Sequence, residues 1–163
     1  MEKQLSQEQI EQYVGRAEDL FRQGFNCAQA VVAACAPLYG VDEQTALRFA
    51  ASFGGGIGRM HGVCGAASGM FMLEGLSSGS SVAGDTAGKQ ANYARVRELA
   101  ARFRDEHGSL ICADLLGLPA DASAVFPHCA VRMSESGKKP CVAMVGNAVR
   151  IFFAKKSVKD LHG

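Results

Sequence analysis

The sequence lacks several features by which common protein classes are recognised. It has no tryptophan, and phenylalanine and tyrosine together make up only 7% of the residues. Its 17 basic residues nearly balance its 16 acidic ones. This balance gives no electrostatic basis for binding nucleic acid or an anionic membrane surface, so we expect neither as a partner. A composition poor in aromatics and rich in glycine and alanine favours closely packed helices over a β-sandwich.

Long apolar segments are also missing. The longest apolar run, from Ala28 to Tyr39, contains Gln29 and Pro37, whereas a membrane-spanning helix needs about 20 apolar residues. The first residues are polar and acidic, so we expect no secretory signal. These observations predict a cytoplasmic protein with one domain over residues 1–163. In that reducing compartment cysteines are expected to serve as ligands, redox thiols or core residues, not as permanent disulfides.

Helical periodicity and capping residues recur along the chain. Ser6 and Asn26 each precede an apolar stripe and are followed three residues later by glutamine, which is the pattern of a capping box. Asp42 stands before another such stripe. We expect helices over about 6–22, 26–35, from 42, and over 64–76, 89–106 and 110–116, with a last helix from 140. No alternating strand pattern is present, so the prediction is an all-α protein.

Two stretches interrupt the helices in a way that shapes the predicted architecture. The run Phe53-Gly54-Gly55-Gly56-Ile57-Gly58 must form a loop or a tight crossing. No strand precedes it and no Gly-Lys-Ser/Thr follows, so a nucleotide site is not expected there. Residues 77–88 and 119–139 have loop composition. The expected fold is a compact single-domain helical bundle with a Gly-rich crossing loop.

Four of the six cysteines stand where a helix is predicted to begin: Cys27, Cys64, Cys112 and Cys141. A helix start carries unpaired N–H groups and about half a positive charge, which lowers a thiol pKa and favours thiolate. Thiolate is the form that binds metals and exchanges disulfides. The chain has no C-x-x-C pair of the kind found in zinc ribbons or ferredoxins. Any shared site must therefore be assembled from residues far apart in the sequence. Four small residues of the core are the competing interpretation.

The other two cysteines have different surroundings. Cys35 lies among valines and alanines, eight residues after Cys27 on the same predicted helix. That spacing is about 12 Å along a helix, beyond the roughly 7 Å that a disulfide allows between Cα atoms. Cys35 is therefore predicted to be a buried structural thiol. Cys129 lies in a loop and is either a reactive thiol, a spare ligand or structural filler.

The histidines and the small helix beginning at Cys64 carry weaker signals. His61 is expected to be a polar loop residue, and His107 to cap a helix C-terminus, where a partly positive imidazole is favourable. Gly65 and Gly69 are four residues apart and share one helix face. That face either lets a neighbouring helix approach closely or leaves room for a metal cluster. A homodimer packed through this helix is also compatible with the sequence.

The order of these motifs resembles the C_GCAxxG_C_C family of small redox-active proteins. The resemblance covers roughly residues 10 to 155. It rests on Phe25-Asn26-Cys27-Ala28-Gln29, the glycine run at 53–58, Cys64-Gly65-Ala66-Ala67-Ser68-Gly69, Cys112-Ala113-Asp114-Leu115-Leu116-Gly117 and Cys141. The family label spells its middle motif G-C-A-x-x-G, whereas this chain reads C-G-A-x-x-G. Cys35 and Cys129 stand outside the four-cysteine pattern.

Related domains occur in split-Soret-type cytochromes, where the cysteine set is associated with an iron–sulfur centre. The resemblance thus implies Cys27, Cys64, Cys112 and Cys141 as cluster ligands, with [2Fe–2S] favoured over [4Fe–4S]. It also implies single-electron exchange with an unidentified redox partner protein.

Two further hypotheses stay open at this stage. The first is a thiol–disulfide or persulfide carrier in which Cys27 and Cys64 form a low-pKa pair. The second is a structural zinc site, with no redox role, in an interaction module. A chain that binds no cofactor is compatible with the first. The sequence offers no substrate pocket, so it does not decide whether the protein is an enzyme.

Overall fold

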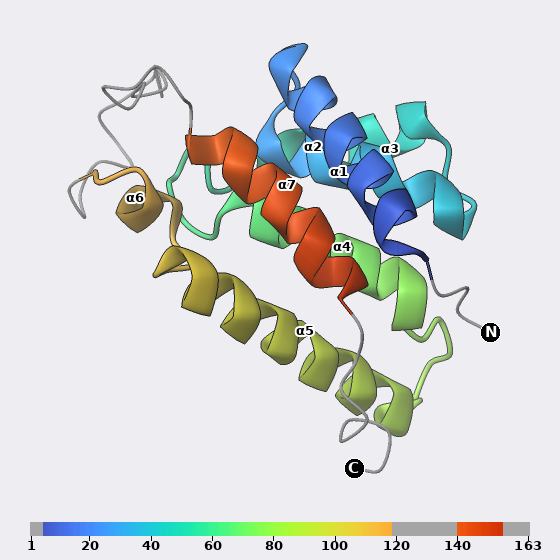
Figure 1. Cartoon of the computed structure of the whole chain (residues 1–163). Helices are drawn as coiled ribbons and strands as arrows, with labels where there is room; N and C mark the ends of the chain where they lie inside the picture. Colours follow the sequence, from blue (N-terminus) through green and yellow to red (C-terminus); the bar gives the residue numbers. More distant parts are fainter. Residues whose placement is uncertain (1–4, 119–139, 155–163) are drawn as a thin grey trace.

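A computed structural model describes residues 5–118 and 140–154 of the chain, and within these ranges the fold is all-α, as predicted (Figure 1). The predicted loop at 119–139, with Cys129 and His128, lies outside the described residues. Seven α-helices and two short 3-10 helices occupy the described part: α1 (Gln7–Arg22), α2 (Cys27–Cys35), η1 (Ala36–Tyr39), α3 (Glu43–Ala50), η2 (Ala51–Phe53), α4 (Gly65–Ser78), α5 (Thr86–His107), α6 (Cys112–Leu115) and α7 (Pro140–Phe153).

The predicted helix starts near the N-terminus are confirmed. Ser6 accepts a hydrogen bond from the Gln9 N–H, and the Gln9 side chain accepts one from the Ser6 N–H. Asn26 and Gln29 make the same reciprocal pair at the start of α2. Each pair satisfies two backbone groups that a helix end would otherwise leave without a partner. Asp42 caps α3 by accepting from the Thr45 N–H at 2.9 Å.

Two helix boundaries differ from the prediction. Helix α5 begins at Thr86, not at Lys89, because Asp85 caps it and accepts from the Gly88 N–H at 2.8 Å. Because glycine has low helix propensity, the sequence did not indicate that Gly88 lies in the first turn of α5. Helix α6 covers only Cys112–Leu115, because Ile111 lies in extended backbone and pairs with Val63 in the segment before α4.

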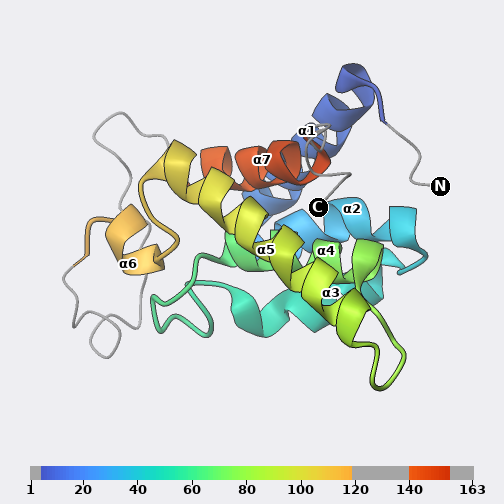
Figure 2. The same ribbon diagram turned by 90° about the horizontal axis from the view of Figure 1, so that it is seen from below.

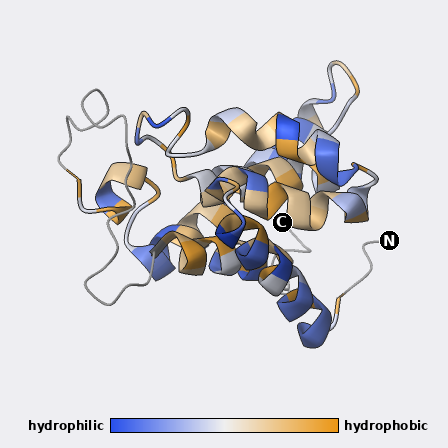
Figure 3. Ribbon diagram, turned by 90° about the horizontal axis from the view of Figure 1, so that it is seen from above, coloured by the Kyte–Doolittle hydropathy of each residue, from blue (hydrophilic) through white to orange (hydrophobic). Residues whose placement is uncertain are grey.

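Helix α2 is the centre of the bundle. From Ala30 to Cys35 every side chain is buried, and the helix is apolar all round, as expected for a helix that neighbours cover on every side. It packs against α1, α3, α4 and α7, while α5 lies across α4 and α7 (Figure 2). Hydrophilic and hydrophobic residues are interspersed along the outer helices (Figure 3). On α1 the inward face consists of Ile10, Val14, Ala17 and Leu20, which are all buried.

Helix α4 approaches α2 through its glycines. A Cβ atom at Gly65 would lie 3.2 Å from the Cys27 Cβ, and one at Gly69 would lie 3.0 Å from the Val31 Cβ. The prediction that these two glycines share one closely packed face is confirmed. Because α2 covers that face within the chain, a homodimer stays a prediction that would need another surface.

The last helix is held along the first. Arg150 on α7 makes two hydrogen bonds of 2.8 Å to the carboxylate of Glu11 on α1. Tyr13 and Phe153 stack with their ring centroids 5.7 Å apart. The predicted inward face of α7 is confirmed, since Val145, Ala148, Ile151 and Phe152 are all buried. None of the described helices is long and apolar enough to cross a membrane.

Candidate four-thiol site

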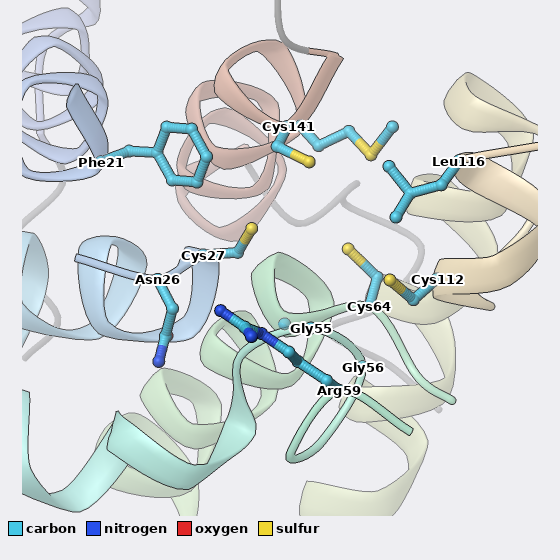
Figure 4. Close-up of a pocket in the computed structure, with 12 residues that line it drawn as sticks. Phe21, Asn26, Cys27, Gly55, Gly56, Arg59, Cys64, Cys112, Leu116 and Cys141 are labelled. Atoms are coloured by element: carbon cyan, nitrogen blue, oxygen red, sulfur yellow. The ribbon is translucent and has the colours of Figure 1, made fainter. Parts of the chain in front are cut away.

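Four cysteines from four separate helices line one cavity of about 130 Å³ (Figure 4). Cys27 is the first residue of α2, Cys64 is the N-cap of α4, Cys112 is the first residue of α6, and Cys141 is the second residue of α7. The fold thus brings together all four residues that the sequence singled out. Cys35 is completely buried at the other end of α2, as predicted.

The four sulfurs form two pairs. The Cys27 thiol donates a hydrogen bond to the Cys141 sulfur, which joins the starts of α2 and α7. Figure 4 shows the Cys64 and Cys112 side chains next to each other on the other side of the cavity, with both sulfurs directed into it. The hydrogen-bonded neighbour of Cys27 is therefore Cys141, and not Cys64, with which the thiol–disulfide hypothesis paired it.

A single β-bridge brings Cys64 and Cys112 together. Val63 pairs with Ile111 in antiparallel orientation. On either side, the Cys64 N–H donates to the Leu110 carbonyl at 2.7 Å and the Cys112 N–H donates to the Gly62 carbonyl at 2.6 Å. Because side chains alternate along extended backbone, both cysteines fall on the same face of this short ladder. One bridge leaves no alternating pattern, so sequence reasoning missed it.

The glycine run forms the wall of the cavity next to Cys112. Gly56 has a φ of +70°. A Cβ atom there would lie 2.7 Å from the Cys112 Cβ and 2.6 Å from the Gly62 nitrogen, closer than real Cβ atoms approach. Only glycine fits this backbone conformation at this distance. The loop therefore forms part of the wall of the thiol site.

The same loop holds three residues other than glycine in the left-handed region: Ile57, Arg59 and His61, with φ between 56° and 67°. Such conformations persist where surrounding contacts enforce them, and they concentrate at binding sites. The Arg59 side chain lines the cavity together with the thiols, and Figure 4 shows its guanidinium directed toward Cys27. This places a permanent positive charge beside four potential thiolates.

The pKa values of the thiols differ from the prediction. The hydrogen bond to Cys141, burial and the neighbouring thiols raise the pKa of Cys27 well above its ordinary value. Burial raises the pKa of Cys64, although the N–H groups of Ala67 and Ala66 at the start of α4 act in the opposite direction. The expectation that a helix start lowers the thiol pKa was therefore wrong for these two residues. Desolvation and crowding outweigh the helix-start effect.

Both described histidines also differ from expectation. His61 does lie in a loop, but it is only 3% exposed, and neither ring nitrogen has a hydrogen-bond partner among the described residues. His107 is the last residue of α5 and stacks on Phe103 with ring centroids 4.5 Å apart. Burial lowers the pKa of His107, so the predicted partly positive imidazole was wrong.

The comparisons with known proteins bear on the whole site. Residues 25–154 match the family described as "Putative redox-active protein (C_GCAxxG_C_C)". The chain belongs to this family. The match includes all four cysteines of the cavity, whereas α1 precedes it. Membership in the C_GCAxxG_C_C family supports a redox role without specifying a cofactor. The searches of curated proteins and of solved structures found no match.

In the described part of the chain, no group of three or more His, Cys, Asp or Glu side chains is already arranged as a metal-ion site. The four thiols instead stand as two pairs on a shared cavity.

Proposed function

We propose that the protein binds an iron–sulfur cluster through Cys27, Cys64, Cys112 and Cys141 and transfers single electrons. The observation that carries this proposal is the convergence of the four thiols on one cavity. They come from helix starts distributed over most of the chain, and chance burial of four small core residues would not direct them to a common space. When bound, such a cluster supplies a one-electron couple within protein.

The residues around the cavity fit this group in size. A volume of about 130 Å³ lies well below the roughly 300–1,000 Å³ of pockets for drug-sized ligands and organic cofactors. Glycine at positions 56 and 65 keeps the space open, because a Cβ atom at either would lie within 3.2 Å of the Cβ of Cys112 or Cys27, respectively. A small inorganic centre suits this space better than a flavin or nicotinamide.

The residues also fit in charge. Four thiolates around two ferric ions and two sulfides leave a dianionic centre. The guanidinium of Arg59 and the Ala66 and Ala67 N–H groups at the start of α4 would stabilise that charge. Both contributions favour the more negative, reduced state and therefore raise the reduction potential relative to a bare cluster.

The arrangement in pairs supports [2Fe–2S] over [4Fe–4S] and over a single zinc ion. In a [2Fe–2S] centre each iron takes two protein ligands. Cys27 with Cys141, and Cys64 with Cys112, offer two such ligand pairs. Zinc would instead require all four sulfurs at about 2.3 Å from one point.

Purification without oxygen tests the proposal. The protein should be brown and contain iron and acid-labile sulfide in comparable amounts. Replacing each of the four cysteines by serine should lower bound iron severely, whereas Cys35→Ser should leave it nearly unchanged because Cys35 lies outside the cavity. Colourless protein without iron refutes the cluster, and one zinc per chain in place of iron supports the structural alternative.

A further inference from the structure

We propose that Cys27 and Cys141 form a reversible disulfide when the cluster-free protein meets a low-molecular-weight disulfide, and that this bond prevents cluster uptake. The inference rests on the position of the two side chains, which face one cavity from the starts of two packed helices (Figure 4), and not on the cluster itself. It assigns a covalent modification to one half of the four-thiol site.

The position of the two residues favours this pair. Cys27 begins α2 and Cys141 lies in the first turn of α7, and these helices pack against each other. The sulfurs are already in hydrogen-bonding contact. Forming a bond of about 2.05 Å therefore starts from two sulfurs that the packing of α2 with α7 already holds near each other.

The other two thiols are less accessible to an external disulfide. Cys64 and Cys112 occupy diagonal positions across the Val63–Ile111 bridge. These residues are also only 5% and 8% exposed, whereas Cys27 and Cys141 are half-buried. A disulfide from solvent thus reaches the Cys27–Cys141 pair more easily.

The reaction balances with an external disulfide as the oxidant. The Cys141 sulfur, which accepts the hydrogen bond, attacks one sulfur of the small disulfide and releases its other half as a thiol. A mixed disulfide on Cys141 results. The Cys27 sulfur then attacks the Cys141 sulfur and releases the second small thiol, which carries away the Cys27 proton. Two protein thiols are oxidised, and one external disulfide is reduced to two thiols.

Disulfide mapping tests the proposal on the complete chain. Protein freed of metal by chelation, reduced and then desalted without oxygen, is exposed to glutathione disulfide, alkylated and digested for mass spectrometry. We expect the Cys27–Cys141 crosslink to exceed every other cysteine pair by about tenfold, because preorganised groups react fastest. A different pair forming first, or glutathione adducts without a crosslink, overturns the proposal.

Two variants sharpen the result. Cys27→Ser should abolish the crosslink and trap one glutathione on Cys141, and far-UV circular dichroism verifies that the helices are retained. Cys35→Ser should leave the crosslink unchanged, because Cys35 is completely buried. A Cys27→Ser protein that traps glutathione on Cys64 instead contradicts the assigned order of attack.

Uptake of ferrous iron and sulfide without oxygen tests the block on the site. The crosslinked protein should retain severalfold less iron after desalting than the reduced protein, and peptide mapping verifies that the bond persists. Equal uptake overturns the block. If the reduced protein also takes up no iron, the block and the proposed cluster are both refuted, while the mapping still decides the disulfide on its own.

Discussion

Gly56→Ala is the substitution that most directly tests how the glycine loop supports the thiol site. The added Cβ atom would lie 2.7 Å from the Cys112 Cβ and 2.6 Å from the Gly62 nitrogen, whereas ordinary van der Waals contact begins near 3.4 Å. The Gly62 carbonyl accepts the Cys112 N–H. Relief of the clash therefore moves the segment that fixes Cys112.

Two effects add in this variant. Alanine in the left-handed region costs roughly 1–2 kcal/mol, and overpacking against atoms that cannot move freely costs about 1–3 kcal/mol more. The free energy of unfolding should thus fall by about 2–5 kcal/mol. Gly58 supplies a matched control, because its φ is +56° but a Cβ atom there meets nothing within 4 Å. Gly58→Ala should lower the free energy of unfolding by only about 1–2 kcal/mol.

Urea unfolding of the metal-free protein measures both values, and bound iron in the anaerobically purified protein measures the effect on the site. We expect Gly56→Ala to lose most of its iron and Gly58→Ala to keep it. Equal losses of stability together with equal iron contents would show that the loop does not position Cys112.

Three further outcomes follow from buried groups elsewhere. Gly69→Ala should lower the free energy of unfolding by about 1–3 kcal/mol, because the added Cβ atom would press on Val31. Gly75→Ala, in open space on the same helix, should raise it by about 0.5–1 kcal/mol. Urea denaturation measures both changes, and equal shifts would contradict the close packing at Gly69. Burial raises the pKa of the Cys35 thiol to about 12. Iodoacetamide at about pH 8, where an ordinary thiol ionises appreciably, should therefore label Cys35 only after unfolding, which peptide mapping can measure. Rapid labelling of Cys35 in the folded protein would contradict its burial. The folded state lowers the pKa of His107 below 6.5, so the unfolded chain binds the proton more tightly and stability should fall as the pH drops below about 6.5. Replacing His107 by glutamine should weaken that pH dependence in urea titrations, and an unaltered dependence would assign it to other groups.

Helix starts were predictable from the sequence because their determinants are local. Each helix cap bonds to an amide only three residues further along the chain, so a short stretch of sequence holds both partners. This applies to the caps at Ser6, Asn26 and Asp42. Gly88 shows the limit of that reasoning. Because glycine has low helix propensity, the sequence placed Gly88 in a loop and the cap at Asp85 was missed. In the structure Asp85 caps α5, which begins at Thr86.

The site was predictable in composition but not in arrangement. Four cysteines at helix starts identified the residues, because each start is a local feature. Their division into pairs depends on the packing of α2 with α7 and on one bridge between Val63 and Ile111. The direction of the thiol pKa values also depends on burial and on neighbouring sulfurs. These are long-range properties that no short segment encodes.

Helix α1 contributes no residue to the family motif, yet it supports the helix that presents Cys141. A version shortened to residues 25–154 would keep every cysteine of the cavity but would strip the outer side of α7 of the Glu11 and Tyr13 contacts. The apolar surface of α7 would then face water, and α7 would lose the contacts with α1 that hold it in place. We therefore expect that the smallest unit able to hold all four sulfurs in place is larger than residues 25–154 and includes α1.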